Sequence, residues 1–258
     1  MTADIKAGTA AGREKPFSPE RLIIALDYSD PGQARALVKK LQPLGVGFKV
    51  GLELFLAGGP ALVKELARQS FVFLDLKFHD IPNTVAAAVK SATTLGVQML
   101  NIHAAGGKKM LKAAREVLPD EKDRPILLAV TVLTSMDDQE MAETGCHGTT
   151  GERVLRLAHL SAECGLDGVV CSPLEIDLVK NRVPGNLLTV TPGIRLTGDD
   201  SGDQVRIATP DRVIEAGGDF LVVGRPVTRA SDPLKAVQEI FSAMQFIRSG
   251  KGGHNENK

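Results

Sequence analysis

Residues 71–85 read Phe-Val-Phe-Leu-Asp-Leu-Lys-Phe-His-Asp-Ile-Pro-Asn-Thr-Val. The first four residues are apolar and predict a buried β-strand, on which side chains two residues apart share a face. Asp75 and Lys77 therefore point the same way, and Asp80 follows just past the strand end. Charges at the end of a buried strand are costly to desolvate. A strand with only a structural role would carry Val or Ile there, so the segment indicates a functional site.

Similar apolar runs precede and follow this segment along the chain. Short runs rich in Val, Ile and Leu are typical of parallel strands that are covered on both faces. The expected strands are Leu22–Asp27, Gly45–Val50, Phe71–Lys77, Gln98–His103, Ile126–Leu133, Gly168–Ser172, Leu187–Thr191 and Phe220–Gly224.

Amphipathic stretches with helical spacing lie between these runs. One predicted helix is Pro31–Leu41, and Asp30 before it is a suitable N-cap ahead of a proline at the first helical position. Its expected buried face consists of Ala34, Leu37, Val38 and Leu41. Further helices are predicted at Gly151–Cys164 and at Pro233–Met244, the latter with Asp232 as its N-cap.

Eight strands that alternate with helices predict an α/β protein with a single-domain (β/α)8 TIM barrel. The alternative is a doubly wound open sheet. It is disfavoured because no Gly-x-Gly-x-x-Gly follows the first strand and no shift in composition marks a second domain. We expect a loose N-terminal leader at 1–18, the catalytic barrel at 19–248 and a flexible tail at 249–258.

Composition argues against several classes of partner. The 258 residues include 31 Lys+Arg and 31 Asp+Glu, so no net charge attracts nucleic acid or an anionic membrane. Trp is absent and aromatic residues make up 4%, which disfavours a platform for stacking single-stranded nucleic acid. No apolar run reaches the roughly 18 residues that a membrane-spanning helix needs.

Cysteine usage and the N-terminus bear on the compartment. The cysteines are Cys146, Cys164 and Cys171, an odd number without a Cys-x-x-Cys pair. A disulfide framework and a cysteine zinc site are therefore both disfavoured, and three free thiols in a reducing cytoplasm are expected. Residues 1–20 are polar and lack a signal-peptide core.

Polar residues cluster at the ends of the expected strands, where the chemistry of a (β/α)8 barrel takes place. Any one of them could be a solvated loop residue, but the coincidence across all eight strands indicates a ligand site. They are Asp27, Lys49, Asp75, Lys77, Asp80, Asn101, His103, Thr134, Ser135, Ser172, Thr191 and Arg225, with Arg195 and Gly224 beside them. His103 is either a base or a packed histidine, and no spacing of histidines and carboxylates suggests a metal site.

Gly224-Arg225 is interpreted as a phosphate grip, because glycine lets a backbone N–H approach an anion and arginine offers two parallel donors. The alternative is an arginine that caps the barrel rim. Residues 195–204 form a polar, glycine-rich loop that is long enough for a lid, with Arg195 and Gln204 as its ligand-facing ends. The alternative there is an idle surface loop.

Lys49, Asp75, Lys77 and Asp80 can form a network in which each charge keeps its neighbours ionised. A lysine fixed between carboxylates stays protonated, which suits a proton donor and not a Schiff-base nucleophile. An ionised aspartate beside the reacting carbon repels a substrate carboxylate, and loss of CO2 relieves that repulsion. The neighbouring ammonium stabilises the carbanion and then protonates it. This chemistry requires no metal and no organic cofactor.

Residues 75–84 resemble the signature of the orotidine 5′-monophosphate decarboxylase family, in its bacterial type. The bare Asp-x-Lys-x-x-Asp pattern is shared by a wider group of phosphosugar barrels, whereas the full stretch is more specific. Further segments resemble the family in order: Ile24–Asp27, Phe48–Gly51, Val132–Met136, Gly168–Ser172, Thr191–Arg195, Gly202–Gln204 and Gly224–Pro226.

The resemblance implies a cofactor-free enzyme that decarboxylates orotidine 5′-monophosphate to uridine 5′-monophosphate and so completes pyrimidine synthesis. Lys77 would be the proton donor and Asp75 the anion beside the substrate carboxylate. The remaining implied contacts are Lys49 and Asp27 with the ribose, Thr134 and Ser172 with the pyrimidine, Gln204, Gly224 and Arg225 with the phosphate, and Arg195 at the lid. The resemblance also implies a homodimer in which Asp80, Ile81 and Thr84 reach the neighbouring subunit's site.

Two rival functions remain open. A metal-dependent phosphosugar decarboxylase or aldolase would share the Asp-x-Lys-x-x-Asp pattern but would need acidic ligands at other strand ends, and only Asp27 stands there. Activity in excess chelator would exclude it. A non-catalytic nucleotide-binding barrel would bind uridine 5′-monophosphate without needing Lys77.

Overall fold

The computed structural model describes residues 18–119, 124–195 and 206–250. Eight parallel strands pair in chain order and close into a barrel, because β1 also pairs with β8. The strands are β1 (Leu22–Ala25), β2 (Gly47–Gly51), β3 (Val72–Phe78), β4 (Met99–His103), β5 (Ile126–Val130), β6 (Gly168–Val170), β7 (Leu188–Thr191) and β8 (Phe220–Val223). The predicted (β/α)8 barrel is confirmed.

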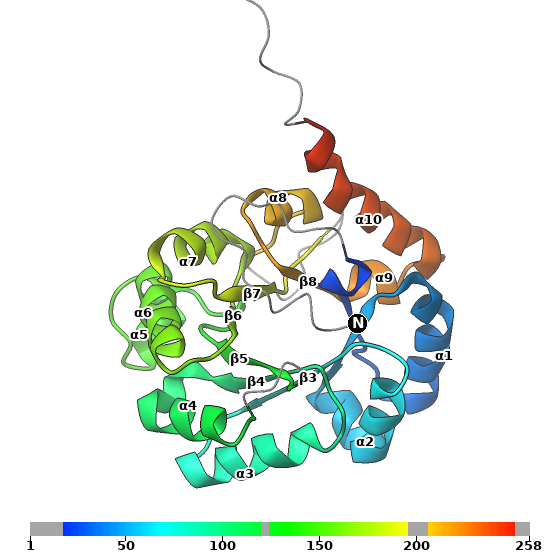
Figure 1. The fold of residues 1–258 in the computed structure, drawn as a ribbon. Helices are drawn as coiled ribbons and strands as arrows, with labels where there is room; N and C mark the ends of the chain where they lie inside the picture. Colours follow the sequence, from blue (N-terminus) through cyan, green and yellow to red (C-terminus); the bar gives the residue numbers. More distant parts are fainter. Residues whose placement is uncertain (1–17, 120–123, 196–205, 251–258) are drawn as a thin grey trace, which may run out of the picture.

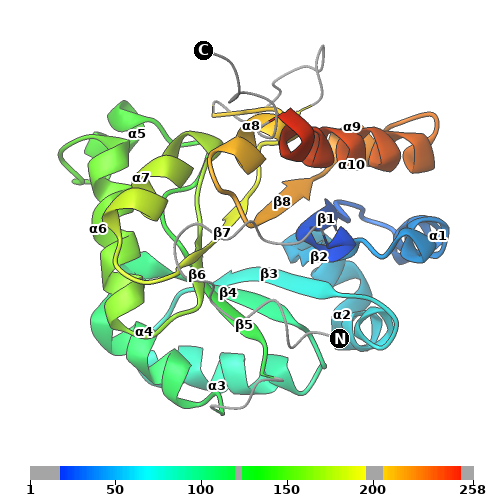
Figure 2. The ribbon, with the colours of Figure 1, turned by 45° about the horizontal axis from the view of Figure 1, so that its top comes forward.

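Helices form a ring around the strands, as the two views of the ribbon show (Figures 1 and 2). They are α1 (Pro31–Leu41), α2 (Leu52–Ala67), α3 (Pro82–Thr93), α4 (Gly107–Glu116), α5 (Asp138–Glu143), α6 (Thr150–Glu163), α7 (Ile176–Arg182), α8 (Pro210–Glu215), α9 (Arg225–Thr228) and α10 (Pro233–Gly250). Short 3-10 turns occur at η1 (Pro19–Arg21), η2 (Gln42–Leu44), η3 (Ala104–Gly106) and η4 (Pro173–Glu175). None of the described helices is long and apolar enough to cross a membrane.

Helix α1 illustrates how local sequence sets an element. Its bounds and its buried face agree with the prediction, and the Asp30 carboxylate accepts a hydrogen bond from the Gly32 amide at 2.8 Å. Helix α10 also begins as predicted, with Asp232 accepting from the Leu234 amide at 3.1 Å. It continues to Gly250, however, and so includes the first two residues of the expected tail. Residues 1–17 of the expected leader and 251–258 of the tail lie outside the described residues.

The barrel has two apolar layers. The inner one fills the barrel and comes from side chains two residues apart on the same strand, such as Ile126 and Leu128 or Phe220 and Val222. The larger, outer layer lies between the strands and the surrounding helices. Because both faces of each strand are buried, the open positions for polar chemistry are at the strand ends.

Several strands are shorter than predicted at their carboxyl ends. β1 ends at Ala25, β5 at Val130 and β6 at Val170, so Asp27, Thr134 and Ser172 stand in the loops that follow. The apolar runs continue beyond the strands because the next residues stay buried, as Leu26 and Cys171 do, and their amides still donate to Lys49 and Val190 on the neighbouring strands.

Candidate active site

A cavity of about 600 Å³ opens at the carboxyl ends of the strands. This size falls within the usual range for small-molecule sites. The described residues that line it are Ala25, Asp27, Lys49, Glu53, Phe73, Asp75, Lys77, Val130, Val132, Leu133, Thr134, Val170, Cys171, Pro192, Gly193, Arg195, Val222, Gly224, Arg225, Thr228 and Arg229. Every strand, or the loop that follows it, contributes except β4.

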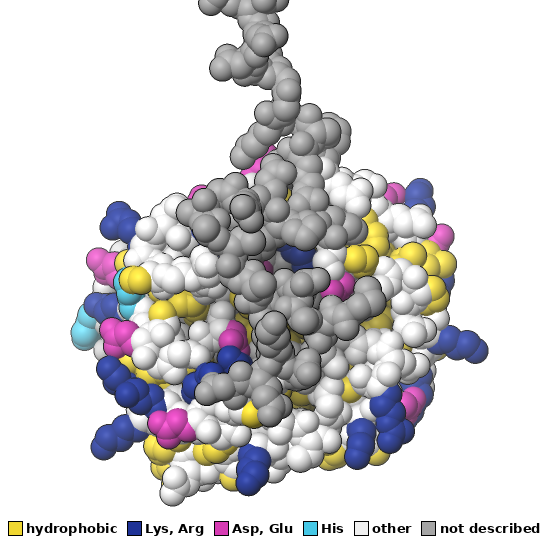
Figure 3. All heavy atoms as spheres, viewed as in Figure 1, with side chains coloured by type: hydrophobic (Ala, Val, Ile, Leu, Met, Phe, Trp, Pro, Cys, Tyr) yellow, Lys and Arg dark blue, Asp and Glu magenta, His cyan; other side chains and the backbone are white. Residues whose placement is uncertain are grey.

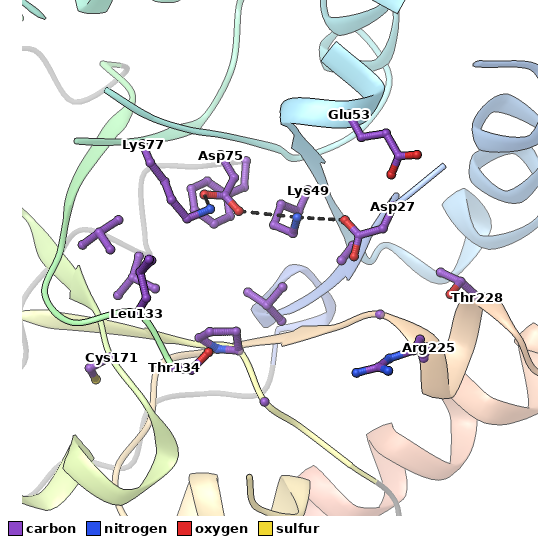
Figure 4. Close-up of a pocket in the computed structure, with 18 of the residues that line it drawn as sticks. Asp27, Lys49, Glu53, Asp75, Lys77, Leu133, Thr134, Cys171, Arg225 and Thr228 are labelled. Carbon is purple, nitrogen blue, oxygen red and sulfur yellow. Dashed lines mark hydrogen bonds and ion pairs between the residues drawn. The ribbon is translucent and has the colours of Figure 1, made fainter. Parts of the chain in front are cut away.

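One wall of the cavity is a chain of alternating charges. Lys49 Nζ lies 3.1 Å from Asp27 Oδ1 and 3.4 Å from Asp75 Oδ2, and Lys77 Nζ lies 2.7 Å from Asp75 Oδ1. Figure 4 shows Lys49 between the two carboxylates. Asp75 is buried, whereas Asp27 is the most exposed member of the four. Within one chain, the order is therefore Asp27–Lys49–Asp75–Lys77.

The electrostatics of this wall keep its buried members ionised. Burial acts to raise the pKa of Asp75, but the ammonium groups of Lys49 and Lys77, with hydrogen bonds from Lys77 and Asn101, hold that pKa below its ordinary value. For Lys49, burial acts to lower the pKa, and Asp75 and Asp27 outweigh it, so that the pKa is raised. A negative charge and a positive charge are thus fixed side by side at the mouth of β3.

The backbone of β3 is irregular at this point. Leu74 pairs with Leu100 and Phe78 with Ile102, so the register with β4 shifts between the two pairs. Lys77 lies inside the shift and has a φ of 51°, and it is the one non-glycine residue with positive φ in the described part of the chain. A non-glycine residue with this backbone conformation is strained by about 1–3 kcal/mol.

The opposite end of the cavity carries arginines. Gly224 follows β8, and Arg225 begins α9 and points into the cavity, far from Lys77 (Figure 4). Barrel closure brings this end next to β1: a Cβ added at Gly224 would lie 3.5 Å from Asp27 Oδ2. Arg195 is buried and also lines the cavity, together with Arg229. The site therefore has a cationic end and an end with alternating charges.

The structure brings most of the predicted site residues together. Those at the cavity are Asp27, Lys49, Asp75, Lys77, Thr134, Arg195, Gly224 and Arg225. Ser172 is fully buried next to Cys171, and its amide donates to the Glu175 carboxylate at 2.8 Å. Gln204 lies outside the described residues.

Three predicted residues stand apart from the cavity of their own chain. Asp80, Ile81 and Thr84 are exposed and are not among its described lining residues. The Asp80 carboxylate accepts a hydrogen bond from the Ile81 amide at 2.6 Å. In one chain, Asp27 thus takes the fourth place in the charged network that the sequence had suggested for Asp80.

Sequence reasoning missed Glu53, Thr228 and Arg229 as lining residues. Glu53 is the second residue of α2, whereas Thr228 ends the short helix α9 and Arg229 follows it. All three lie within a few residues of a strand end, and this position is the signal that could have found them. The sequence-based prediction also gave Asn101 no role beyond its place near a strand end. His103, considered as a base, lies against His79 with the two rings tilted and their centroids 5.3 Å apart, and burial beside His79 and Lys77 lowers the pKa of His103.

On the part of the face that Figure 3 leaves uncovered, basic and acidic side chains of the described residues are dispersed around the rim. In the described ranges, no three His, Cys, Asp or Glu side chains gather as a metal site would require.

The sequence of the chain matches a known protein family. Residues 20–240 match the model of the orotidine 5′-phosphate decarboxylase / HUMPS family. The chain belongs to this family. A relative named orotidine 5′-phosphate decarboxylase from Chromobacterium violaceum is 50% identical over 232 residues, covering 90% of the chain and 93% of the relative. One of the same name from Legionella pneumophila (strain Lens) is 53% identical over 223 residues, covering 86% and 97%. The family resemblance expected from the sequence is confirmed.

Solved structures agree with this assignment. A crystal structure of orotidine 5′-phosphate decarboxylase from Lactobacillus acidophilus is similar with a TM-score of 0.77 and 41% identity, covering 86% of this chain and 98% of that one. An uncharacterised protein from Geobacillus kaustophilus gives a TM-score of 0.76 at 37% identity, with 86% and 99% covered. Both matches extend over nearly the whole of the solved chains.

Proposed function

We propose that the cavity decarboxylates orotidine 5′-phosphate to uridine 5′-phosphate in pyrimidine biosynthesis, with Lys77 as the proton donor and without a metal or organic cofactor. The observation that carries the proposal is the ion-paired chain Asp27–Lys49–Asp75–Lys77 at the mouth of the barrel. Family membership and the names of relatives about 50% identical support the reaction.

In the proposed reaction, the bond between C6 of the pyrimidine and its carboxyl carbon breaks. CO2 leaves and the electron pair stays on C6. The ionised Asp75 repels the substrate carboxylate, and this repulsion disappears when CO2 departs. The ammonium of Lys77, held 2.7 Å from Asp75 Oδ1, stabilises the developing negative charge and then transfers its proton to C6. Lys77 recovers a proton from water.

The rest of the cavity would bind the nucleotide. Lys49 and Asp27 would hold the ribose hydroxyls, and Thr134 and Ser172 would lie by the pyrimidine. At the cationic end, Gly224, Arg225 and Gln204 would grip the phosphate, with Arg195 beside them. Since Arg225 and Lys77 lie at opposite ends (Figure 4), phosphate binding would orient the base toward the proton donor.

Metal removal tests the cofactor-free part of the proposal. The chain is mixed with orotidine 5′-phosphate, and loss of orotate absorbance is followed after dialysis against excess EDTA. Turnover is expected to remain unchanged, because Lys49 and Lys77 already supply the positive charge that a metal would provide. Loss of activity that a divalent cation restores would contradict this and favour the metal-dependent phosphosugar class.

We also propose that the active enzyme is a homodimer with shared sites. Large apolar side chains are exposed near neighbouring strand ends: Leu52 and Leu56 on α2 are 56% and 82% exposed, and Ile81 after β3 is 68% exposed. Contact with a second copy would cover them. Asp80, which is not among the described lining residues of its own cavity, would then serve the partner's.

Subunit mixing tests this sharing. Asp80→Ala and Lys77→Ala variants are each expected to be nearly inactive, whereas dimers formed from an equal mixture should regain about one quarter of the wild-type sites. Lys77→Ala mixed with Asp75→Ala is the matched control, and it should recover nothing because both residues lie in the same cavity. Verified Asp80/Lys77 heterodimers without recovered activity would refute the shared site.

We also propose that the chain has a single catalytic domain and that the protein is cytoplasmic. A single catalytic domain at 19–248 is supported by the closed barrel, whose elements all lie within or directly at these limits. A cytoplasmic location is supported by Cys146, Cys164 and Cys171, all of which are free thiols.

A further inference from the structure

Asn101 on β4 is a fully buried polar residue next to the charged wall. Its side-chain oxygen accepts a hydrogen bond from the Lys77 amide at 2.8 Å, and its side-chain nitrogen donates to Asp75 Oδ1 at 2.7 Å. One amide group thus contacts both residues that the proposed chemistry uses. Asn101 itself does not line the cavity.

The Lys77 amide is the point where the β3 backbone departs from regular geometry. The register with β4 shifts around Lys77, and its φ is 51°. A strand hydrogen bond to the β4 backbone is lost in such a shift. The Asn101 side chain replaces it, because it reaches across from β4 to the displaced N–H.

The Asp75 carboxylate is held by hydrogen bonds or ion pairs at both of its oxygens. Oδ1 accepts from Lys77 Nζ and from Asn101 at 2.7 Å each, while Oδ2 faces Lys49 at 3.4 Å. The carboxylate therefore cannot rotate without losing a hydrogen bond in a buried position, which is costly.

We infer that Asn101 is a positioning residue for the proposed decarboxylation: it holds Lys77 in its strained backbone conformation and locks the orientation of the Asp75 carboxylate. This inference rests on the proposed function. In this conformation Lys77 lines the cavity with its Nζ 2.7 Å from Asp75 Oδ1, and Asn101 holds it there.

A second side-chain amide that bridges β4 and β3 offers a control, because it can show whether the effect of Asn101 is only structural. Gln98, just before β4, also bridges to β3: its side-chain oxygen accepts from the Val72 amide at 2.7 Å and its nitrogen donates to Gly96 O at 2.8 Å. It lies at the other end of the strand and outside the described cavity lining. Gln98→Leu therefore removes a comparable bridge without touching Asp75 or Lys77.

The experiment compares Asn101→Leu with Gln98→Leu in the full chain. Asn101→Leu is expected to lower kcat by about 100-fold, because the reacting groups lose their alignment, while the affinity for uridine 5′-phosphate stays close to wild type. Gln98→Leu should keep kcat. Thermal unfolding and circular dichroism compare the two variants for stability, and a crystal structure of Asn101→Leu should show Lys77 with a negative φ.

The pH dependence of kcat/KM provides a second measurement, and a change in folding stability alone would not alter it. Asp75 is surrounded by Lys49, Lys77 and His103, with His79 behind His103. Loss of the Asn101 donor should raise the pKa of Asp75, so the acid limb of kcat/KM moves to higher pH in Asn101→Leu. Asn101→Asp, which keeps an acceptor for Lys77 but places a carboxylate beside Asp75, should move it further.

Each outcome decides the inference. Wild-type kcat and an unmoved acid limb in Asn101→Leu would overturn it, as would an equal loss of kcat in Gln98→Leu. If Asn101→Leu does not fold, Asn101→Asp decides, since an unmoved acid limb in that variant overturns the inference as well. Failure of the proposed function is recognised separately, because the wild-type chain would then not turn over orotidine 5′-phosphate at all, whereas failure of this inference leaves wild-type turnover intact.

Discussion

Replacing Lys77 by alanine is expected to lower kcat by ~10³-fold or more and to leave uridine 5′-phosphate bound with near wild-type affinity. The change removes the proposed proton donor to C6 and one of the two cations beside Asp75. Binding survives because the cationic end with Arg225 lies at the far side of the cavity (Figure 4). Turnover is measured by the loss of orotate absorbance, and nucleotide binding by calorimetry.

Lys108→Ala is the matched control for this variant. Lys108 forms an exposed ion pair with Glu163 at 3.2 Å, so its removal also deletes one lysine charge but touches no cavity residue. Its kcat should equal that of the wild type. Near-normal turnover in Lys77→Ala would refute the assignment of Lys77 as the proton donor, whereas nucleotide binding without any turnover in the wild type would favour a non-catalytic nucleotide-binding barrel.

Replacing Arg225 by alanine is expected to lower kcat/KM for orotidine 5′-phosphate by about 100-fold or more, which corresponds to roughly 3 kcal/mol. A guanidinium can donate two parallel hydrogen bonds to a phosphate, and in the proposed binding mode this binding energy would orient the distant pyrimidine at Lys77. Both kcat and KM should therefore change. Steady-state kinetics over a range of substrate concentrations measures the two effects.

Two comparisons make the Arg225 result specific. Arg212→Ala removes an arginine that pairs with Glu215 at 3.2 Å on the surface, and it should have no effect. Orotidine without its phosphate should be turned over equally poorly by the wild type and by Arg225→Ala, because the lost contact is to the phosphate. A defect confined to the phosphate-free substrate would show that the grip lies elsewhere.

Much of the site could be predicted because its residues are encoded next to the strands that carry them. Lys49, Asp75 and Lys77 were expected at one edge, and they lie there because the carboxyl ends of parallel strands meet at one mouth of a barrel. Thr134, Arg195 and Arg225 follow the same rule. For such residues, the apolar pattern of the preceding strand is enough to set their position.

The partner of Lys49 was harder to predict. Asp27 and Asp80 both follow strand ends in the sequence, and only the order of strands around the closed barrel separates them. Asp27 lies after β1, beside β2, within 3.1 Å of Lys49 Nζ. Asp80 is carried away by the loop that leads into α3. This choice depends on contacts between segments distant in sequence, which a local pattern does not contain.

The sequence by itself determined the barrel, the apolar layers and the set of charges at its mouth, because these follow from hydrophobic periodicity and from the cost of burying charge. Only the tertiary structure decided the arrangement of those charges. Barrel closure placed Gly224 beside Asp27, and the register shift between β3 and β4 gave Lys77 its positive φ. Asn101 acquired its two contacts from that shift, since hydrogen bonds between neighbouring strands depend on register and not on the residues of either strand alone.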